Sequence, residues 1–461
     1  MSNPHTYDFL VGTFNTPHLY SLRFTLPPSS STTPPPKSSS SPSLKVLHRS
    51  SAIGSHSWLH LSPPKSNGTR NLYATAWTDP PTVVAYAVHS STQISLLGTA
   101  QTQSRSGYVC ASDVAVYSAG GATGEVFSLD PETGNFACSP PSSTTTTTTN
   151  GTPVTPGSTN GQSPIQPLQT LSFIDASTQR DDGSVMDFGG LRHGAHSADL
   201  SPDGLSLYVA DIGRNCIWTF AISPNDGGKA TLSEKHISPR PNDGPRHVWP
   251  HPSGGYVYCL QEHTSMVDVF ATTTTTTSGA NSGVNPNPNL RHEQGVRIIP
   301  PGQHEGDFWA DEVRTSLSSE NGRPKYLYAS TRGLTPQKKG YVAVYKLTEQ
   351  GRIDTSIPSP YASASERLNN GHTEKDVDNG NGNGNGSPYN GLLCMYETAT
   401  SGGWANAIQP GPTVDGVEYL ALTDSEEGWV FVLGWDGKDM KEVARTKLDN
   451  QGAGAATAVW L

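Results

Sequence analysis

Four side chains suited to acid–base or anion-binding chemistry recur at matching positions of an internal repeat. His196 and Arg246 each stand six residues before a proline. Glu262 and Arg332 each stand four residues after a tyrosine. Guanidinium groups bind carboxylates or phosphates through paired hydrogen bonds, whereas imidazole and carboxyl groups transfer protons. These residues predict a site for a small anionic substrate. The two arginines would bind this substrate, and His196 and Glu262 would act as catalytic groups.

Trp404 also stands six residues before a proline, Pro410, and we expect it to bind substrate in the same site. Taken singly, each of the four charged or titratable residues is better explained as a solvated loop group or as part of an ion pair between neighbouring repeats. Their joint occurrence favours a site, because burying several such groups together is costly unless a ligand compensates them.

The repeat that carries these residues has a period of 50 residues in its clearest copies. The segment HSADLSPDGLSLYVADIGRNCIWTF from His196 aligns without a gap with RHVWPHPSGGYVYCLQEHTSMVDVF from Arg246. Each copy has the pattern of alternating strands joined by a tight SPDG or HPSG turn. Looser copies before and after them bring the number of units to seven, the last of which holds a single strand near Ala455.

A period of 40 to 50 residues with three or four strands per unit is typical of a β-propeller. We therefore predict an all-β protein, a seven-bladed β-propeller formed by residues 1–461 as one domain. A pair of β-sandwiches would not explain the gapless offset. Strand-like segments at 7–14 and 18–25 should complete the last blade, because closing the ring in this way leaves no sheet edge unpaired. The starts of the innermost strands would then meet at one mouth of the central channel.

Four stretches of low complexity interrupt the repeat pattern. Their compositions, rich in Ser, Thr, Pro, Asn and Gly, cannot bury enough apolar surface to offset the entropy of ordering. We interpret them as loop insertions, because strand-like sequence resumes after each one with the same pattern. They cover residues 27–43, 142–163, 272–290 and 366–388.

Composition narrows the possible partners and location. The formal net charge of −10 argues against general nucleic-acid binding, and no apolar run is long enough to span a bilayer. The N-terminal sequence MSNPHTYDFLVGTF lacks the features of a secretory signal. The five cysteines are too few and too scattered for a disulfide framework. We expect a cytoplasmic protein with reduced thiols and no membrane partner, and a homo-oligomer is possible.

The sequence offers little support for a metal or cofactor site. It contains no GxSxG, HExxH or Walker motif. His193 and His196 would point to opposite faces of an extended chain. Asp211, Asp311 and Asp424 could in principle surround a calcium ion in the channel, but hydrogen bonds in turns or between blades explain them better. We therefore predict that the protein uses no metal and no cofactor.

Several of these segments resemble the seven-bladed lactonase family, which includes bacterial 6-phosphogluconolactonases and fungal 3-carboxy-cis,cis-muconate cyclases. The similar blocks are HGAHSADLSPDGLSLYVADIGRN, GPRHVWPHPSGGYVYCLQE, ADEV…YLYASTRG, SGGWANAI and LTDSEEGWVFVLGW. The resemblance covers residues 190–461 well and 7–130 weakly. The SGGxxNA and DxxEGW patterns are closer to the fungal cyclases, and the poly-Thr and Ser/Pro-rich insertions suit a protein of a filamentous fungus.

The resemblance implies roles for the same residues that the repeat selects. The cyclases use a histidine, two arginines and a glutamate, which fall here on His196 in GAHS, Arg246 in GPRH, Glu262 in LQEH and Arg332 in STRG. This chain departs from the cyclase pattern at Trp404, where the family has a histidine.

The implied activity is a cofactor-free isomerisation that closes 3-carboxy-cis,cis-muconate to its lactone, in the β-ketoadipate pathway of aromatic-compound catabolism. His196 or Glu262 would deliver the proton, and we favour His196 because nearby arginines would keep Glu262 ionised. The alternatives are hydrolysis of a phosphosugar lactone by the same residues and a non-catalytic propeller scaffold. We also expect substitutions at these rim positions to leave thermal stability nearly unchanged.

Overall fold

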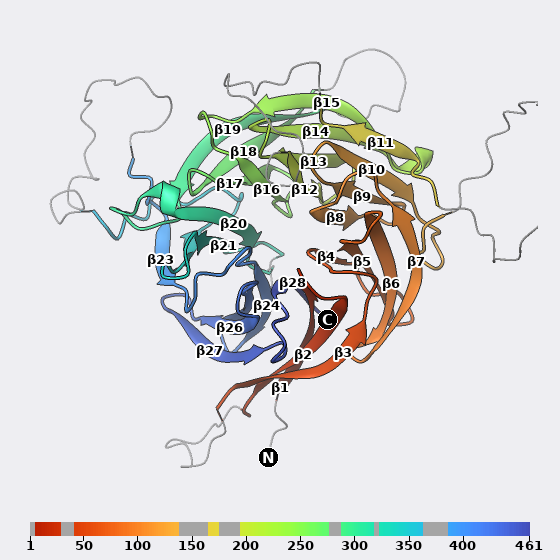
Figure 1. Cartoon of the computed structure of the whole chain (residues 1–461). Coiled ribbons are helices and arrows are strands. Elements are labelled where there is room, and N and C mark those ends of the chain that lie inside the picture. Colours follow the sequence, from red (N-terminus) through yellow and green to blue (C-terminus); the bar gives the residue numbers. More distant parts are fainter. Residues whose placement is uncertain are drawn as a thin grey trace, which may run out of the picture.

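The chain folds into a ring of seven four-stranded antiparallel sheets, arranged like blades around a central axis (Figure 1). This computed structural model describes residues 5–28, 41–137, 165–174, 194–275, 287–317, 322–362 and 386–461. The seven-bladed β-propeller predicted from the repeat is therefore confirmed.

Each blade contributes one strand to each of four concentric layers. The innermost strands are β4 (Leu59–Leu61), β8 (Tyr108–Ala111), β12 (Ala195–Leu200), β16 (Pro245–Pro250), β20 (Phe308–Thr315), β24 (Ile408–Val414) and β28 (Ala455–Trp460). The second layer is β1 (His5–Thr13), β5 (Arg70–Ala76), β9 (Ala115–Ala119), β13 (Ser206–Asp211), β17 (Tyr256–Gln261), β21 (Tyr326–Gly333) and β25 (Val417–Thr423).

The two outer layers complete the blades. The third layer is β2 (His18–Leu26), β6 (Thr82–Ser90), β10 (Thr123–Ser128), β14 (Cys216–Ser223), β18 (Met266–Thr275), β22 (Tyr341–Lys346) and β26 (Trp429–Trp435). The outermost strands are β3 (Ser43–Ser51), β7 (Gln93–Gln101), β11 (Gln169–Ser172), β15 (Lys229–Ile237), β19 (Asn287–Arg297), β23 (Leu392–Glu397) and β27 (Met440–Lys447).

Helices play almost no part in the described ranges. Two single-turn 3₁₀ helices, Pro224–Asp226 and Glu305–Asp307, lie in the connections between strands. No helix in this part of the chain is long and apolar enough to cross a membrane.

The two ends of the chain close the ring within one blade. Strand β1 pairs with β28, and Phe9, Leu10 and Val11 lie opposite the last residues of the chain. The four strands of this blade follow the order β28, β1, β2, β3. The closure predicted from the single strand near Ala455 is thus confirmed, and it leaves every innermost strand covered by a neighbour.

The hydrophobic core is divided among the seven interfaces between adjacent blades. Each interface contains its own cluster of buried apolar side chains drawn from both sheets. At the closing blade, for example, Phe9 and Val11 pack with Tyr419 and Val430 of the preceding blade. Because each sheet is buried on both faces, its strands carry runs of apolar residues, and every blade contributes buried apolar surface to the interfaces on both of its sides.

The repeated glycine of the SPDG and HPSG turns has a conformational reason. Gly204 and Gly254 adopt φ values of 70° and 74°, in the left-handed region that favours glycine. A Cβ atom at either position would have no heavy atom within 4 Å, so backbone conformation rather than crowding requires glycine.

Three consecutive innermost strands contain a β-bulge at the same place. The pairing with the second strand skips one residue in each, and the skipped residues are His196 in β12, Arg246 in β16 and Asp311 in β20. At a bulge, two residues of one strand face one residue of its partner, which changes the direction of the local side chains. The repeat therefore includes a bulge that the sequence alignment alone did not reveal.

One predicted insertion is partly wrong in its boundaries. Within 272–290, residues 272–275 and 287–290 are strand, and Thr272 pairs with Leu290. Threonine is β-branched and suits a strand even in a biased sequence. Residue Ser43, the last of 27–43, begins β3. The segments 29–40, 142–163, 276–286 and 366–385 lie outside the described residues.

Four of the five cysteines lie in the described ranges, and all four are free thiols. Cys110, Cys216 and Cys259 are buried, and Cys394 is half-buried. Burial raises the pKa of the Cys110 and Cys259 thiols, so these sulfurs are protonated and unreactive at neutral pH. Cys138 lies outside the described residues.

Ring closure should dominate stability at the seam. Phe9 is fully buried, and its ring centroid lies 4.5 Å from that of Trp460. We expect Phe9→Ala to cost roughly 3–5 kcal/mol of unfolding free energy, measured by urea denaturation. Leu96→Ala, at a half-exposed position of the outer strand β7, should change it by less than about 0.5 kcal/mol. Equal effects of the two substitutions would contradict an energetically important seam.

Candidate functional site

A cavity of about 380 Å³ opens at one mouth of the propeller axis. All five residues selected from the sequence line it: His196, Arg246, Glu262, Arg332 and Trp404. The side chains reach the cavity from β12, β16, β21 and the loops that follow β17 and precede β24. The structure therefore brings together residues that span more than 200 positions of the chain.

Aromatic side chains form much of the remaining wall. Phe14, Trp58, Trp77 and Trp309 come from three blades and face the same cavity. Planar rings offer a large apolar surface at low conformational cost. The cavity therefore suits a small, flat ligand whose polar groups can reach the arginines.

The strand pairing corrects the position assigned to Trp404. His196 is the bulged second residue of β12, whereas β24 begins only at Ile408 and pairs with β25 without a bulge at its start. Trp404 therefore lies in the loop before β24 and does not occupy the place of His196. Counting back from Pro410 failed because this proline lies within the strand.

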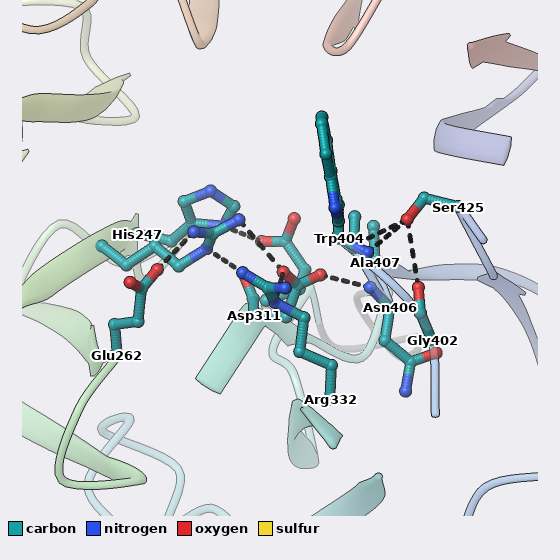
Figure 2. A network of polar contacts seen from close by, with 12 residues as sticks. His247, Glu262, Asp311, Arg332, Gly402, Trp404, Asn406, Ala407 and Ser425 are labelled. Carbon is teal, nitrogen blue, oxygen red and sulfur yellow. Dashed lines mark hydrogen bonds and ion pairs between the residues drawn. The ribbon is translucent and has the colours of Figure 1, made fainter. Parts of the chain in front are cut away.

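Trp404 nevertheless lines the cavity from the preceding loop, where its side chain is 62% exposed and extends away from the polar network (Figure 2). Its backbone N–H donates to the Ser425 hydroxyl, as does that of Ala405 at 3.0 Å. The loop thus holds the indole at the rim of the cavity.

A buried ion cluster forms the centre of the site. One Nη atom of Arg246 donates to the carboxylate of Glu262, and the other donates to Asp311 Oδ1 at 3.0 Å. Arg246 Nε also donates to the backbone carbonyl of Asp311 at 3.2 Å. All three side chains are buried. Arg246 therefore joins two adjacent blades, and three of its five N–H groups serve the protein itself.

The second arginine approaches the same carboxylate from the next strand (Figure 2). Arg332 Nε lies 3.8 Å from Asp311 Oδ1, and its guanidinium carbon lies 4.7 Å from the centre of the Trp309 ring. Its Nη1 donates to the backbone carbonyl of Gly403 at 2.8 Å. This cation–π contact and the hydrogen bond hold the guanidinium group at the cavity wall.

The SGGWANA segment is anchored to the cluster through its backbone. The N–H of Asn406 donates to Asp311 Oδ2 at 2.6 Å, and the Asn406 side chain donates to the Thr331 carbonyl at 3.0 Å. Gly402 and Gly403 adopt φ values of 89° and 67°, which turn the chain so that the Gly403 carbonyl reaches Arg332. The SGGWANA segment thus connects the ion cluster to the blade formed by β24 to β27.

The cluster keeps Glu262 ionised. Burial by itself would raise the pKa of Glu262, but Arg246, a hydrogen bond from His263 and Arg332 together lower it well below its usual range. Two guanidinium groups therefore meet two carboxylates, Glu262 and Asp311, in one small volume. Glu262 is a base or a structural anion in the ligand-free protein and holds no proton to donate.

His196 is uncharged in the same environment. Burial lowers its pKa well below the usual range, and Arg246 and His247 lower it further, while Glu262 opposes them only in part. Its Nδ1 is buried without a hydrogen-bond partner among the described residues. If His196 donates a proton, a bound anion must first raise its pKa.

Reasoning from the sequence missed a second histidine and a carboxylate. His247 also lines the cavity, with its ring centroid 5.2 Å from that of His196. Its Nδ1 lies 3.0 Å from Glu312 Oε1. Strict strand alternation would turn His247 and Glu312 away from the faces that hold Arg246 and Asp311, and the bulges at those two positions remove this alternation. The histidine of the GPRH block was visible in the sequence, but its direction was not.

The three aspartates weighed as calcium ligands have other partners. Asp311 bridges blades through Arg246, and Asp211 accepts from the Arg214 N–H and the Trp218 indole. Asp424 accepts from the N–H groups of Glu426 and Glu427. Within the described ranges, no three His, Cys, Asp or Glu side chains gather into a group that could hold a metal ion. His193 lies outside those ranges.

Comparison of the sequence with known proteins identifies related families and enzymes. A family model described as "Lactonase, 7-bladed beta-propeller" matches residues 36–357. The muconate cycloisomerase 1 of Cutaneotrichosporon cutaneum is 33% identical over 99% of both chains. The carboxy-cis,cis-muconate cyclase of Neurospora crassa is 27% identical over 58% of this chain and 60% of its own length.

Solved structures share the architecture at low identity. The periplasmic gluconolactonase of Pseudomonas aeruginosa has a TM-score of 0.62 at 14% identity and covers 99% of both chains. A putative 6-phosphogluconolactonase of Bacteroides fragilis has a TM-score of 0.60 at 16% identity, covering 99% of this chain and 98% of its own. These similarities show a common fold.

The burial of the cluster argues against the expectation that rim substitutions leave stability nearly unchanged. Arg246→Met would leave Glu262 and Asp311 buried without their main partner, which should cost roughly 3–5 kcal/mol of unfolding free energy. Arg291→Met removes a solvent-exposed arginine paired with Glu293 and should cost no more than about 1 kcal/mol. Urea denaturation of both variants measures the difference, and an Arg246→Met protein as stable as the wild type would show that the cluster contributes little.

Proposed function

The chain belongs to the seven-bladed β-propeller lactonase family, and we propose that it is a cofactor-free isomerase that closes a muconate-type polycarboxylate to a lactone. The substrate predicted from the sequence is 3-carboxy-cis,cis-muconate. The observation that carries the proposal is the cavity, which brings two guanidinium groups, two uncharged imidazoles and aromatic walls within reach of one small molecule.

Binding would use both kinds of wall. The flat conjugated diene fits against tryptophan rings such as Trp58 and Trp309. Arg332 would bind a carboxylate at the open side of the ion cluster. Arg246 would use the N–H groups that Glu262 and Asp311 leave for a ligand. Trp404 would cover the substrate from the rim.

The proposed reaction forms one C–O bond and one C–H bond. A carboxylate oxygen of the substrate adds to a conjugated double bond and closes the lactone. The π electrons move to the carbon next to the remaining carboxylate, and that carbon takes a proton. Arg246 and Arg332 would stabilise the developing enolate-like charge, an effect worth about 3–4 kcal/mol for one well-placed donor.

Lactone formation and lactone hydrolysis have opposite proton balances. Closing the ring converts an ionised carboxylate into an ester, so each turnover takes up one proton from water. Hydrolysis of a phosphosugar lactone creates a carboxylate and releases one proton. Hydrolysis stays the second candidate, because an uncharged imidazole such as His196 can activate water as a general base.

The proton balance therefore tests the function directly. We expect purified protein given 3-carboxy-cis,cis-muconate to remove the diene absorbance and to consume one proton per molecule converted in a pH-stat, without added metal or nucleotide. Proton release from 6-phosphogluconolactone, above the rate without protein, would support the hydrolase instead. No change with either compound would favour the non-catalytic scaffold.

Arg332 should matter for substrate capture and for turnover. We expect Arg332→Gln to lower kcat/KM by about 10²–10³-fold, because a charge-stabilising donor is lost in the transition state. Arg323→Gln, at a surface ion pair with Glu349, should leave kcat and KM unchanged. Steady-state kinetics of the two variants decides, and an unchanged kcat/KM for Arg332→Gln would remove Arg332 from the site. The cytoplasmic location and the possible homo-oligomer stay predictions.

A further inference from the structure

His247 and Glu312 form a buried pair that faces the cavity from two adjacent blades. His247 Nδ1 lies 3.0 Å from Glu312 Oε1, and the two residues are 3% and 1% exposed. His247 lines the cavity, and its Nε2 has no hydrogen-bond partner among the described residues. One nitrogen of the ring is therefore held by the carboxyl group, and the other is left for a ligand.

The neighbours of the pair leave it little freedom to move. The His247 ring packs edge-on against Trp58 and Tyr108, at centroid distances of 5.2 and 5.4 Å. Glu312 Oε1 also accepts from the Val313 N–H at 3.1 Å and lies 3.0 Å from Arg314 Nη1. Arg314 in turn donates to the Tyr108 hydroxyl. The carboxyl group fixes the orientation of the imidazole, as in other carboxyl–histidine pairs.

Charge around the pair disfavours an imidazolium ion. Burial lowers the pKa of His247 well below its usual range, and Arg246 and Arg314 lower it further. Burial raises the pKa of Glu312 to about 7, although Arg314, the Val313 N–H and Arg246 oppose the rise. Near neutral pH, a proton bound by the pair therefore resides on the Glu312 carboxyl group. It does not reside on the His247 ring as a second proton.

The other groups facing the pair come from several elements of the fold. They are His196 of β12, Glu262 after β17, Asp311 of β20, Arg332 of β21, and Tyr108 of β8 with its acceptor Asp199. Glu262 and Asp311 thus balance Arg246. Arg314 instead faces Glu312 and Asp199, and burial raises the pKa of both carboxyl groups to about 7. Of these two, Glu312 is the one in direct contact with the His247 ring.

We propose that His247, positioned by Glu312, delivers the proton to carbon in the lactone-forming reaction. This inference rests on the proposed function. In the step, the Nε2–H proton passes to the substrate carbon while the Glu312 O–H proton passes to Nδ1. The imidazole changes tautomer without becoming charged, and Glu312 ends as a carboxylate. One proton from water then returns to Nε2 while the Nδ1 proton passes back to Glu312, which restores both groups and accounts for the proton consumed in each turnover.

His196 has a different role in this arrangement. Its Nδ1 has no hydrogen-bond partner in the described structure, so no carboxyl group there can replace a donated proton. His196 is then a hydrogen-bonding group for the substrate, and its loss should raise KM more than it lowers kcat.

The pH profile of kcat is the first test. We expect wild-type kcat to fall as the pH rises through about 7, because Glu312 loses the proton that the step needs. Glu312→Gln should lower kcat by about 10²-fold or more with a smaller change in KM, and should abolish this fall. His251→Gln is the matched control, because His251 is a buried histidine at the far end of the same strand pair and contacts Ser253. It should keep the wild-type profile. A Glu312→Gln enzyme with wild-type kcat and profile would overturn the inference.

Histidine ¹⁵N NMR of the ligand-free protein is the second test, and it does not depend on turnover. The His247 ring should carry its proton on Nε2 below about pH 7 and on Nδ1 above it, and Glu312→Gln should remove this change. If this tautomer change occurs in a protein that does not convert muconate, the result would support the His247–Glu312 pair and refute the proposed function. Turnover with no tautomer change in the wild type would refute the pair alone, even if the Glu312→Gln protein did not fold.

Discussion

One extra residue in each of three innermost strands creates the site. A regular strand alternates its side chains between the two faces of its sheet, which in this ring pack against the two neighbouring blades. The bulges at His196, Arg246 and Asp311 break that alternation at the same height in three consecutive blades. As a result Arg246 and His247 both contact groups at the axis, and so do Asp311 and Glu312. The number of polar groups at the mouth of the channel is thereby increased without any change in the blade architecture.

Burial then determines the protonation states. With two arginines and two carboxylates in contact, the arginines hold the pKa of Glu262 low, and burial together with the arginines keeps both histidines uncharged. A site built only to bind anions would leave its arginines unpaired. Here three N–H groups of Arg246 donate hydrogen bonds to Glu262 and Asp311, which fixes the orientation of the guanidinium group before a substrate arrives. The same contacts make the site part of the stability of the protein rather than an addition to it.

Closure of the ring is also needed to bring the residues of the site together. Residues of one blade approach those of the next only because each interface has its own apolar cluster and the closing blade joins both ends of the chain. The SGGWANA segment of the following blade reaches Asp311 and Arg332 through backbone groups, so its glycines and Asn406 position the arginines while Trp404 stays at the rim. Blade packing, loop conformation and charge compensation thus act on one cavity.

The sequence by itself determined the blade number, the closure and five residues of the cavity, because repeat period, turn residues and apolar alternation are local properties that recur in every unit. It also indicated that arginines would hold Glu262 ionised. It did not reveal Asp311 as the partner of Arg246, the His247–Glu312 pair, or the true place of Trp404. Those depend on strand register and on which blades are adjacent, and a bulge leaves no reliable mark in a single sequence. Protonation states likewise were decided only by the tertiary structure, since they arise from burial and from charges far apart along the chain.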